Sequence, residues 1–227
     1  AAVTQMMLES GVRSGDLVAV GMTGSLPGLN VAVLAACRAI GAEPIIVTSV
    51  GSSMFGATDP ELTWLDMEQV CVKRGLWNYR SLAASLGGGG DAGRGLSPQG
   101  RQLLLDAMRR SGTAYLGAPN LFEAVKARVA LYDSVAAARG KPIRLYVNVG
   151  GGVASLGGAQ NARLIPAGLT RRLAAKNYPN RGVLNVLAER RIPVVQLLEV
   201  ESLARTYSIV DPRTGAPPRP GKGLLFI

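Results

Sequence analysis

The sequence predicts a single α/β domain built as a three-layer, doubly wound and mostly parallel sheet of the Rossmann-like kind. Apolar strand-like runs alternate along the chain with helix-like segments, as in parallel sheets with crossover helices. Residues 44–49 (PIIVTS) form an uninterrupted run typical of a strand buried on both faces. The 227 residues are 48% hydrophobic but only 5% aromatic, which indicates a core rich in Val, Leu and Ala.

In the first half of the chain, turn and cap signals delimit each element. Residues 1–16 read as part of a helix, and 16–22 as the first strand. Pro27 stands early in a helix over 27–40, where its missing N–H costs no hydrogen bond, and Gly41 ends that helix. The second strand covers 44–49. A helix over 60–74 follows, with Asp59 as its predicted N-cap.

The second half begins with a loop-rich centre, and the same signals return after it. Ser97 caps a helix with Pro98 in its first turn. The remaining predicted strands cover residues 113–116, 143–149 and 193–198, and the predicted helices cover residues 97–111, 120–139, 168–176, 181–191 and 199–207. These elements place the domain at residues 1–210. The Pro/Gly-rich composition of residues 211–227 predicts an extended tail.

The formal charge of +10 is unevenly distributed. Residues 1–60 carry two basic and four acidic groups, whereas residues 121–180 carry nine basic and two acidic ones. A basic half favours a polyanionic partner, although an Arg-rich composition alone gives the same pattern. The basic and aromatic residues are not interleaved, so nucleic acid is not an expected partner.

The chain contains no histidine, which excludes a Ser-His-Asp triad, a Cys-His dyad and the usual zinc sites. The two cysteines, Cys37 and Cys71, lie in apolar helical patterns without CxxC spacing. We expect free thiols, or a disulfide in an exported domain. The sequence therefore predicts neither a metal site nor a cofactor.

Four Gly- and Ser-rich loops each follow a strand or a probable strand end. They cover residues 22–25, 49–59, 85–95 and 148–158. Parallel strands send their exits to one edge of the sheet, so we expect these loops to form one anion-binding cleft there. The predicted ligand-binding residues are Thr23, Gly24, Ser25, Ser52, Ser53, Gly88, Arg94, Asn148, Gly150 and Gly151. The alternative is that each loop is an ordinary tight turn.

Three carboxylates are candidates for acid–base chemistry. Asp66 and Glu68 lie in an apolar stretch (TWLDME), where burial raises carboxyl pKa values, and we expect one of them on the cleft wall. Asp91 shares a glycine-rich loop with Arg94, either as a solvated pair or in a lid that closes over a ligand. Ser25 occupies a nucleophile-like position but has no His base, so it reads as a hydrogen-bond donor to an anion.

Four blocks together resemble the bacterial poly-γ-glutamate system protein family, whose genes accompany those for poly-γ-glutamate synthesis and export. These blocks run from residues 15–68 and from residues 80–97, and include VNVGGGVASLG (147–157) and IPVVQLLEVESLARTY (192–207). The resemblance covers almost the whole chain. It implies an N-terminal membrane anchor ahead of the first residue and a domain held on the outer face of the membrane. No catalytic residue can be carried over from the family.

Three functional hypotheses follow from these observations. The first is an accessory component of poly-γ-glutamate synthesis or export that binds the polymer or another acidic ligand. The second is an amide hydrolase or transferase acting on γ-glutamyl bonds with Asp66, Glu68 or Asp91 as acid or base. The third is a scaffold whose basic helices over 168–191 dock onto the synthase and export membrane proteins or anionic lipid.

Overall fold

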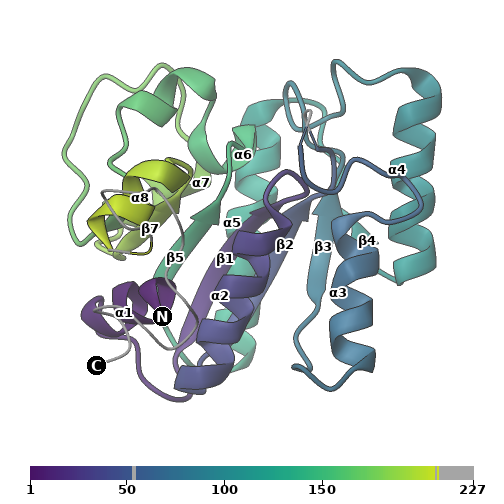
Figure 1. Ribbon diagram of the computed structural model, residues 1–227. Coiled ribbons are helices and arrows are strands. Elements are labelled where there is room, and N and C mark those ends of the chain that lie inside the picture. The colour runs from purple at the N-terminus through teal and green to yellow at the C-terminus, as the bar shows by residue number, and fades with distance from the viewer. Residues whose placement is uncertain (53–54, 208, 210–227) are drawn as a thin grey trace.

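The computed structural model of the protein describes residues 1–52, 55–207 and 209, and within them seven strands form one sheet (Figure 1). The strands are β1 (Leu17–Thr23), β2 (Glu43–Ser49), β3 (Ser81–Ser85), β4 (Ala114–Tyr115), β5 (Ile143–Val149), β6 (Gly168–Thr170) and β7 (Val194–Leu197). They lie in the order β4-β3-β2-β1-β5-β7-β6. Every neighbouring pair is parallel except β6 and β7. The predicted α/β class is confirmed.

Helices cover both faces of this sheet. They are α1 (Ala2–Glu9), α2 (Pro27–Ile40), α3 (Trp64–Lys73), α4 (Pro98–Ser111), α5 (Leu121–Ala138), α6 (Val153–Leu156), α7 (Val183–Glu189), α8 (Val200–Thr206) and the 3-10 helix η1 (Ala159–Arg163). Alternate residues of β1 face opposite sides: Val18 and Val20 pack in one core with α1 to α4, whereas Leu17 and Ala19 pack in the other with α5 to α7. The result is the predicted three-layer arrangement.

Local signals explain the helix boundaries. Pro27 is the first residue of α2, and Gly41 ends it in the left-handed conformation at φ +79°. The side chain of Ser97 caps α4 by accepting a hydrogen bond from the Gly100 N–H at 3.0 Å. Asn120 caps α5 in the same way through the N–H of Glu123.

Three predictions about the elements are wrong. The segment predicted as a helix over 168–176 begins with β6, which pairs with β7 and starts at Gly168 with φ +80°. The helix predicted over 60–74 begins only at Trp64, because Thr63 rather than Asp59 is its N-cap. The loop-rich centre contains β3, for which the sequence indicated only a strand end before the loop over 85–95, because its small Ser and Ala residues lack the usual β-branched signal.

The topology reverses at β1. The strands β2, β3 and β4 lie on one side of β1, and the chain then crosses over so that β5 and β7 lie on the other side. The loops that follow β1 and β5 therefore diverge at the carboxyl edge of the sheet. In open α/β sheets this switch point is the usual place for a ligand.

Candidate functional site

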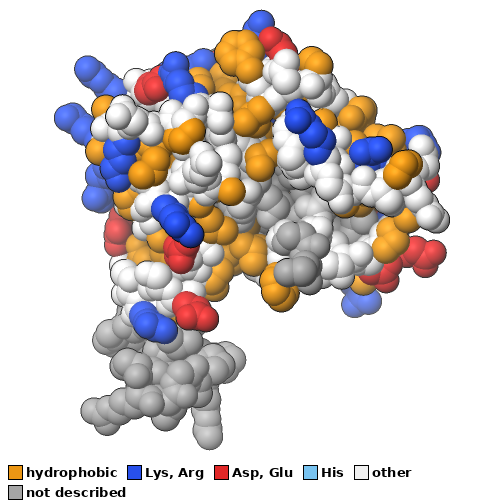
Figure 2. All heavy atoms as spheres, turned by 90° about the horizontal axis from the view of Figure 1, so that it is seen from above, with side chains coloured by type: hydrophobic (Ala, Val, Ile, Leu, Met, Phe, Trp, Pro, Cys, Tyr) orange, Lys and Arg blue, Asp and Glu red, His pale blue; other side chains and the backbone are white. Residues whose placement is uncertain are grey.

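A cleft of about 600 Å³ opens at the carboxyl edge of the sheet, where the loops after β1, β2, β3 and β5 meet. Seen from above in Figure 2, the surface is hollowed near the middle, and its floor is largely uncharged. The lining residues are Thr23, Ser25, Leu26, Ser49, Gly51, Ser52, Phe55, Leu86, Gly87, Gly88, Arg94, Gly95, Leu96, Gly150, Gly151, Gly152, Val153 and Leu198. The four predicted loops thus converge on one cleft rather than lying on different faces.

Close backbone contacts between neighbouring loops explain their glycines. A Cβ atom on Gly24 would lie 2.4 Å from the carbonyl oxygen of Val50, and one on Gly51 would lie 2.5 Å from that of Leu86. Hydrogen bonds continue the sheet into these loops, including Gly24 N–H to Ser49 and Gly51 N–H to Leu86. The side of the cleft over β1 to β3 is therefore a rigid backbone surface.

Polar side chains are buried at the carboxyl ends of five strands, directly beneath the cleft. They are Thr23, Ser49, Ser85, Asn148 and Gln196. The Asn148 Nδ2 group donates to the Gly150 carbonyl at 2.8 Å and to Gln196 Oε1 at 2.6 Å. Asn148 thus holds the loop after β5 in place from below and is not among the residues that line the cleft.

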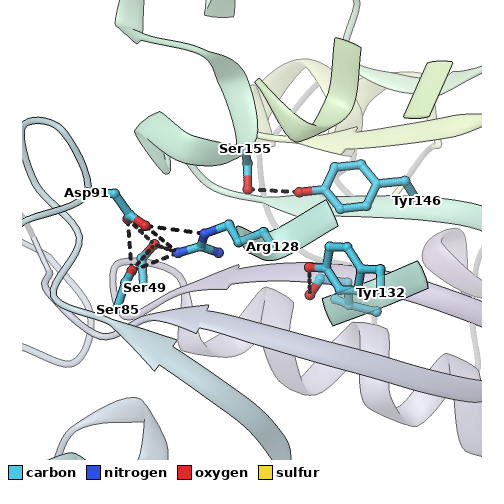
Figure 3. A network of polar contacts seen from close by, with 8 residues as sticks. Ser49, Ser85, Asp91, Arg128, Tyr132, Tyr146 and Ser155 are labelled. Atoms are coloured by element: carbon cyan, nitrogen blue, oxygen red, sulfur yellow. Dashed lines mark hydrogen bonds and ion pairs between the residues drawn. The ribbon is translucent and has the colours of Figure 1, made fainter. Parts of the chain in front are cut away.

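The strongest polar cluster joins Asp91 of the glycine-rich loop to Arg128 of α5 (Figure 3). Arg128 Nη2 lies 2.9 Å from Asp91 Oδ2, and both side chains are only 1% exposed. The hydroxyls of Ser49 and Ser85 donate to Asp91 Oδ1 at 3.1 and 2.8 Å. Both hydroxyl oxygens also accept hydrogen bonds from Arg128 Nη2. Every member is therefore bonded, which a buried charge requires.

This network makes the glycine-rich loop a fixed wall of the cleft. Asp91 adopts φ +63°, an uncommon conformation for a residue other than glycine. Burial alone would lower the pKa of Arg128, but the charge of Asp91 and their hydrogen bonds raise it, so the guanidinium stays ionised. The interpretation of Asp91 as a solvated or lid carboxylate is therefore wrong, and its partner is Arg128 rather than Arg94.

Arg94 is the charged residue that lines the cleft. Its side chain is exposed and has no hydrogen-bond or ion-pair partner among residues 1–52, 55–207 and 209. The backbone of the loop folds back on itself, with the Gly89 N–H bonded to the Arg94 carbonyl at 3.1 Å. A Cβ atom on Gly90 would lie 2.7 Å from Arg94 Nη2. The guanidinium therefore packs across the glycine turn and is available to an anion.

Thr23 places an unusual hydroxyl beneath the cleft lining. Its side chain is only 6% exposed, and Oγ1 has no hydrogen-bond partner in the described part of the chain. Gly150 passes so close that a Cβ atom there would lie 2.4 Å from this oxygen. A buried hydroxyl without a partner costs about 1–3 kcal/mol, so this position lowers the stability of the fold.

Two buried tyrosines fix the strands behind the cleft (Figure 3). The Tyr146 hydroxyl donates to Ser155 Oγ at 2.8 Å, and the Tyr132 hydroxyl donates to the Val20 carbonyl at 2.9 Å. Gly21 makes room for the first of them, since a Cβ atom there would lie 2.5 Å from the Tyr146 oxygen. These contacts tie α5 and α6 to β1 and β5.

Asp66 and Glu68 do not line the cleft, which corrects the expectation that one of them stands on its wall. Asp66 forms a capping box with Thr63 at the start of α3. The guanidinium of Arg110, in α4, donates two hydrogen bonds of 2.7 and 2.6 Å to the Asp66 carboxylate. Burial would raise the pKa of Asp66, but the bonds from Arg110 and Thr63 outweigh it and lower the pKa. Asp66 thus joins two helices.

Glu68 is buried between α3 and the start of β3. Its carboxylate accepts hydrogen bonds from the Ser81 N–H at 2.7 Å and from the Ser81 hydroxyl at 2.9 Å. Burial raises the pKa of Glu68 to about 7 despite these bonds. The raised pKa predicted from the apolar setting is present, but at the amino end of β3, away from the cleft.

The predicted ligand-binding residues divide into three groups. Those that line the cleft are Thr23, Ser25, Ser52, Gly88, Arg94, Gly150 and Gly151. Gly24 and Asn148 lie behind the lining, where they position the loops. Ser53 lies outside the described residues.

The sequence interpretation missed the role of Arg128 and of the serines it contacts. Arg128 is the one cation at a core position of α5, between buried Val125 and Val129, and that placement was the available signal. Ser49 and Ser85 each end a strand, and only the pairing of β2 with β3 brings them together.

Fold and cleft together define the class: a Rossmann-like α/β domain with a glycine-rich cleft at its topological switch point. Comparisons with protein-family models, with curated proteins and with solved structures give no match. Within the described ranges, no helix is long and apolar enough to cross a membrane. The same ranges hold no cluster of three or more Cys, Asp or Glu side chains suited to a metal ion. Cys37 and Cys71 are free thiols, and burial raises the pKa of Cys37 to about 12.

Proposed function

We propose that this domain binds a carboxylate-bearing ligand in the cleft and acts as an accessory component of poly-γ-glutamate synthesis or export. The observation that carries the proposal is the charge of the cleft. Within the described part of the chain, Arg94 lines it without a partner, and no Asp or Glu is among its lining residues. A guanidinium in a neutral, glycine-rich setting favours a carboxylate or another planar anion.

The rest of the lining suits a ligand that also carries amide groups. Glycines from three loops bring backbone close to the ligand, and Ser25 and Ser52 carry hydroxyls, of which that of Ser52 already donates to the Phe55 carbonyl. The volume of about 600 Å³ falls in the usual range for small-molecule sites, about 300–1,000 Å³. A γ-glutamyl chain offers one carboxylate and one amide per unit, which matches both kinds of group.

The sequence resemblance supplies the biological setting of this proposal. It supports poly-γ-glutamate or a glutamate-like unit as the ligand, the synthase and export proteins as neighbours, and an anchor that holds the domain at the outer face of the membrane. The hydrolase alternative receives less support, because Asp66, Glu68 and Asp91 are all engaged in contacts outside the lining. If the domain only binds, polymer incubated with it keeps its length in gel filtration.

Isothermal titration with poly-γ-glutamate and with short γ-glutamyl oligomers tests the proposal. Affinity should fall as salt rises, because exposed charge pairing is screened. Arg94→Ala should weaken binding about tenfold or more, as expected for a lost charged hydrogen bond. Arg74→Ala removes an exposed Arg outside the cleft and should bind as the wild type does. Absence of salt-sensitive binding, or equal affinities for both variants, would rule the proposal out.

A further inference from the structure

A second, separate feature lies on the face covered by α5 and α7. Three hollows of about 550, 420 and 330 Å³ follow one another there. The first and second share Asp133 and Arg190, and the second and third share Arg191. We refer to the three hollows as the cationic trough.

Six cations line the cationic trough against two carboxylates. The cations are Lys126, Arg144, Arg172, Arg181, Arg190 and Arg191, and the carboxylates are Asp133 and Glu189. Both carboxylates are already paired, with Arg190 and Arg181 respectively. Lys126, Arg172 and Arg191 have no hydrogen-bond or ion-pair partner within the described ranges. Figure 2 shows Lys and Arg side chains gathered along the left side of the molecule.

The largest hollow of the trough also has an apolar floor. Val125 and Val129 of α5 line it together with Val186 of α7. Phe122, in the first turn of α5, stands at 74% exposure beside them. A large aromatic side chain left exposed next to an apolar groove is typical of a protein interface.

We infer that the cationic trough docks an acidic amphipathic helix of a partner protein. The groove between α5 and α7 accepts an apolar helix face, and the cationic rim complements carboxylates on the flanks of that helix. A homopolymer of glutamate lacks the apolar side chains that the floor would bury. Single-stranded nucleic acid stacks on several aromatic side chains, and the lining offers only Phe122.

This docking surface overlaps the segment 168–191 predicted for a scaffold, but it also includes α5, and not every cation of that segment lines it. Arg171 and Lys176 do not line the trough, since they bond to the carbonyls of Glu9 and Leu164. Arg172 does line it. The inference is also independent of the ligand cleft, which lies at the carboxyl edge of the sheet.

A fluorescence-anisotropy titration tests the inference. The probe is a labelled synthetic helix of about 18 residues, with Leu on one face and Glu on the flanks. A peptide of the same composition in scrambled order is its control. We expect the ordered peptide to bind at low salt at least tenfold more tightly than the scrambled one.

Matched variants locate the binding. Lys126→Glu with Arg172→Glu, and Phe122→Ser alone, should each weaken peptide binding about tenfold or more, because the first reverses rim charges and the second removes floor area. Arg74→Glu with Arg163→Glu makes the same change in net charge away from the trough and should leave binding unchanged. Arg94→Ala should also leave it unchanged.

Several results would overturn the inference: no binding of the ordered peptide at low salt, or binding that Phe122→Ser does not alter. Competition by poly-L-glutamate or oligo-dT as strong as that by the ordered peptide would show a surface that recognises charge alone. Circular dichroism and urea midpoints verify that each variant is folded. Phe122→Ser keeps the test valid if the charge reversal fails to fold, since this side chain is largely exposed.

Discussion

Arg128 and Asp91, which lie 37 positions apart, form an ion pair that is almost completely buried beneath the wall of the cleft. The pair joins α5 on one face of the sheet to the glycine-rich loop above its edge. Six glycines within residues 87–95 would otherwise leave this loop with a large conformational freedom. The ion pair therefore determines where Arg94 stands, although neither partner lines the cleft.

Removing one partner of this pair should be costly. We expect Arg128→Met or Asp91→Asn to lower the free energy of unfolding by about 3–5 kcal/mol, because each leaves an uncompensated or poorly bonded group in the interior. The double variant should lose less than the sum of the two single losses. Urea unfolding of the four proteins measures this coupling.

The exposed ion pair of Arg190 and Asp133 serves as the control for these stability measurements on the buried pair. Its side chains are 44% and 46% exposed, so Asp133→Asn should change stability by less than about 1 kcal/mol. Equal losses for the buried and the exposed pair would contradict the role assigned to Arg128.

The buried hydroxyl of Thr23 should oppose stability. Thr23→Val keeps the shape of the side chain and removes a buried oxygen that has no partner in the described chain. We expect the variant to be more stable by about 1 kcal/mol, and to bind γ-glutamyl ligand as the wild type does, because the hydroxyl is shielded from the cleft. Thermal unfolding and titration calorimetry on the same samples measure the two effects. A clear loss of stability would instead mean that the hydroxyl bonds within the protein.

Glu68 should make stability depend on pH in the direction opposite to most carboxylates. Its folded pKa of about 7 lies above the ordinary value of 4.5, so the folded protein binds more protons than the unfolded chain between these values. Stability should therefore fall as pH rises from about 4.5 to 7, by roughly 3 kcal/mol at about 1.4 kcal/mol per unit. Above pH 7 this contribution stays constant.

Glu68→Gln removes that titration and keeps a group able to accept a hydrogen bond from Ser81. The quantity to compare is the difference in free energy of unfolding between wild type and variant at each pH. Asp66 and Glu43 have lowered pKa values, so they make stability rise with pH in both proteins, and their contributions cancel in this difference. Parallel stability curves for the two proteins would show that Glu68 does not titrate in this window.

The sequence predicted the sheet well where strands are β-branched and helices carry strong caps. Pro27, Gly41 and Ser97 stand at the boundaries that they indicated. It failed where pairing rather than composition decides the structure. β3 is made of Ser, Leu and Ala and is held by β2, and β6 is held at the sheet edge by β7.

The cleft was predictable from topology, whereas its chemistry was not. Loops that follow parallel strands must share an edge, so Thr23, Ser52 and Gly150 could be placed together without coordinates. The partners of Asp66, Glu68 and Asp91 could not be predicted from the sequence, because each of these carboxylates contacts a residue on another element. Asp66 and Arg110 are 44 positions apart, and no local pattern records such a pair.

The glycines at 24 and 28 give a final test of how the cleft is built. Gly24 lies where a Cβ atom would come within 2.4 Å of the Val50 carbonyl oxygen, whereas a Cβ atom on Gly28 meets nothing within 4 Å. Gly24→Ala should therefore force the loops after β1 and β2 apart, lower stability by about 1–3 kcal/mol and weaken ligand binding. Gly28→Ala, in the first turn of α2, should raise stability by about 0.5–1 kcal/mol, because alanine favours the helix. Urea unfolding and ligand titration of the two variants measure these effects, and equal stabilities would mean that the loops do not meet as closely as the structure shows.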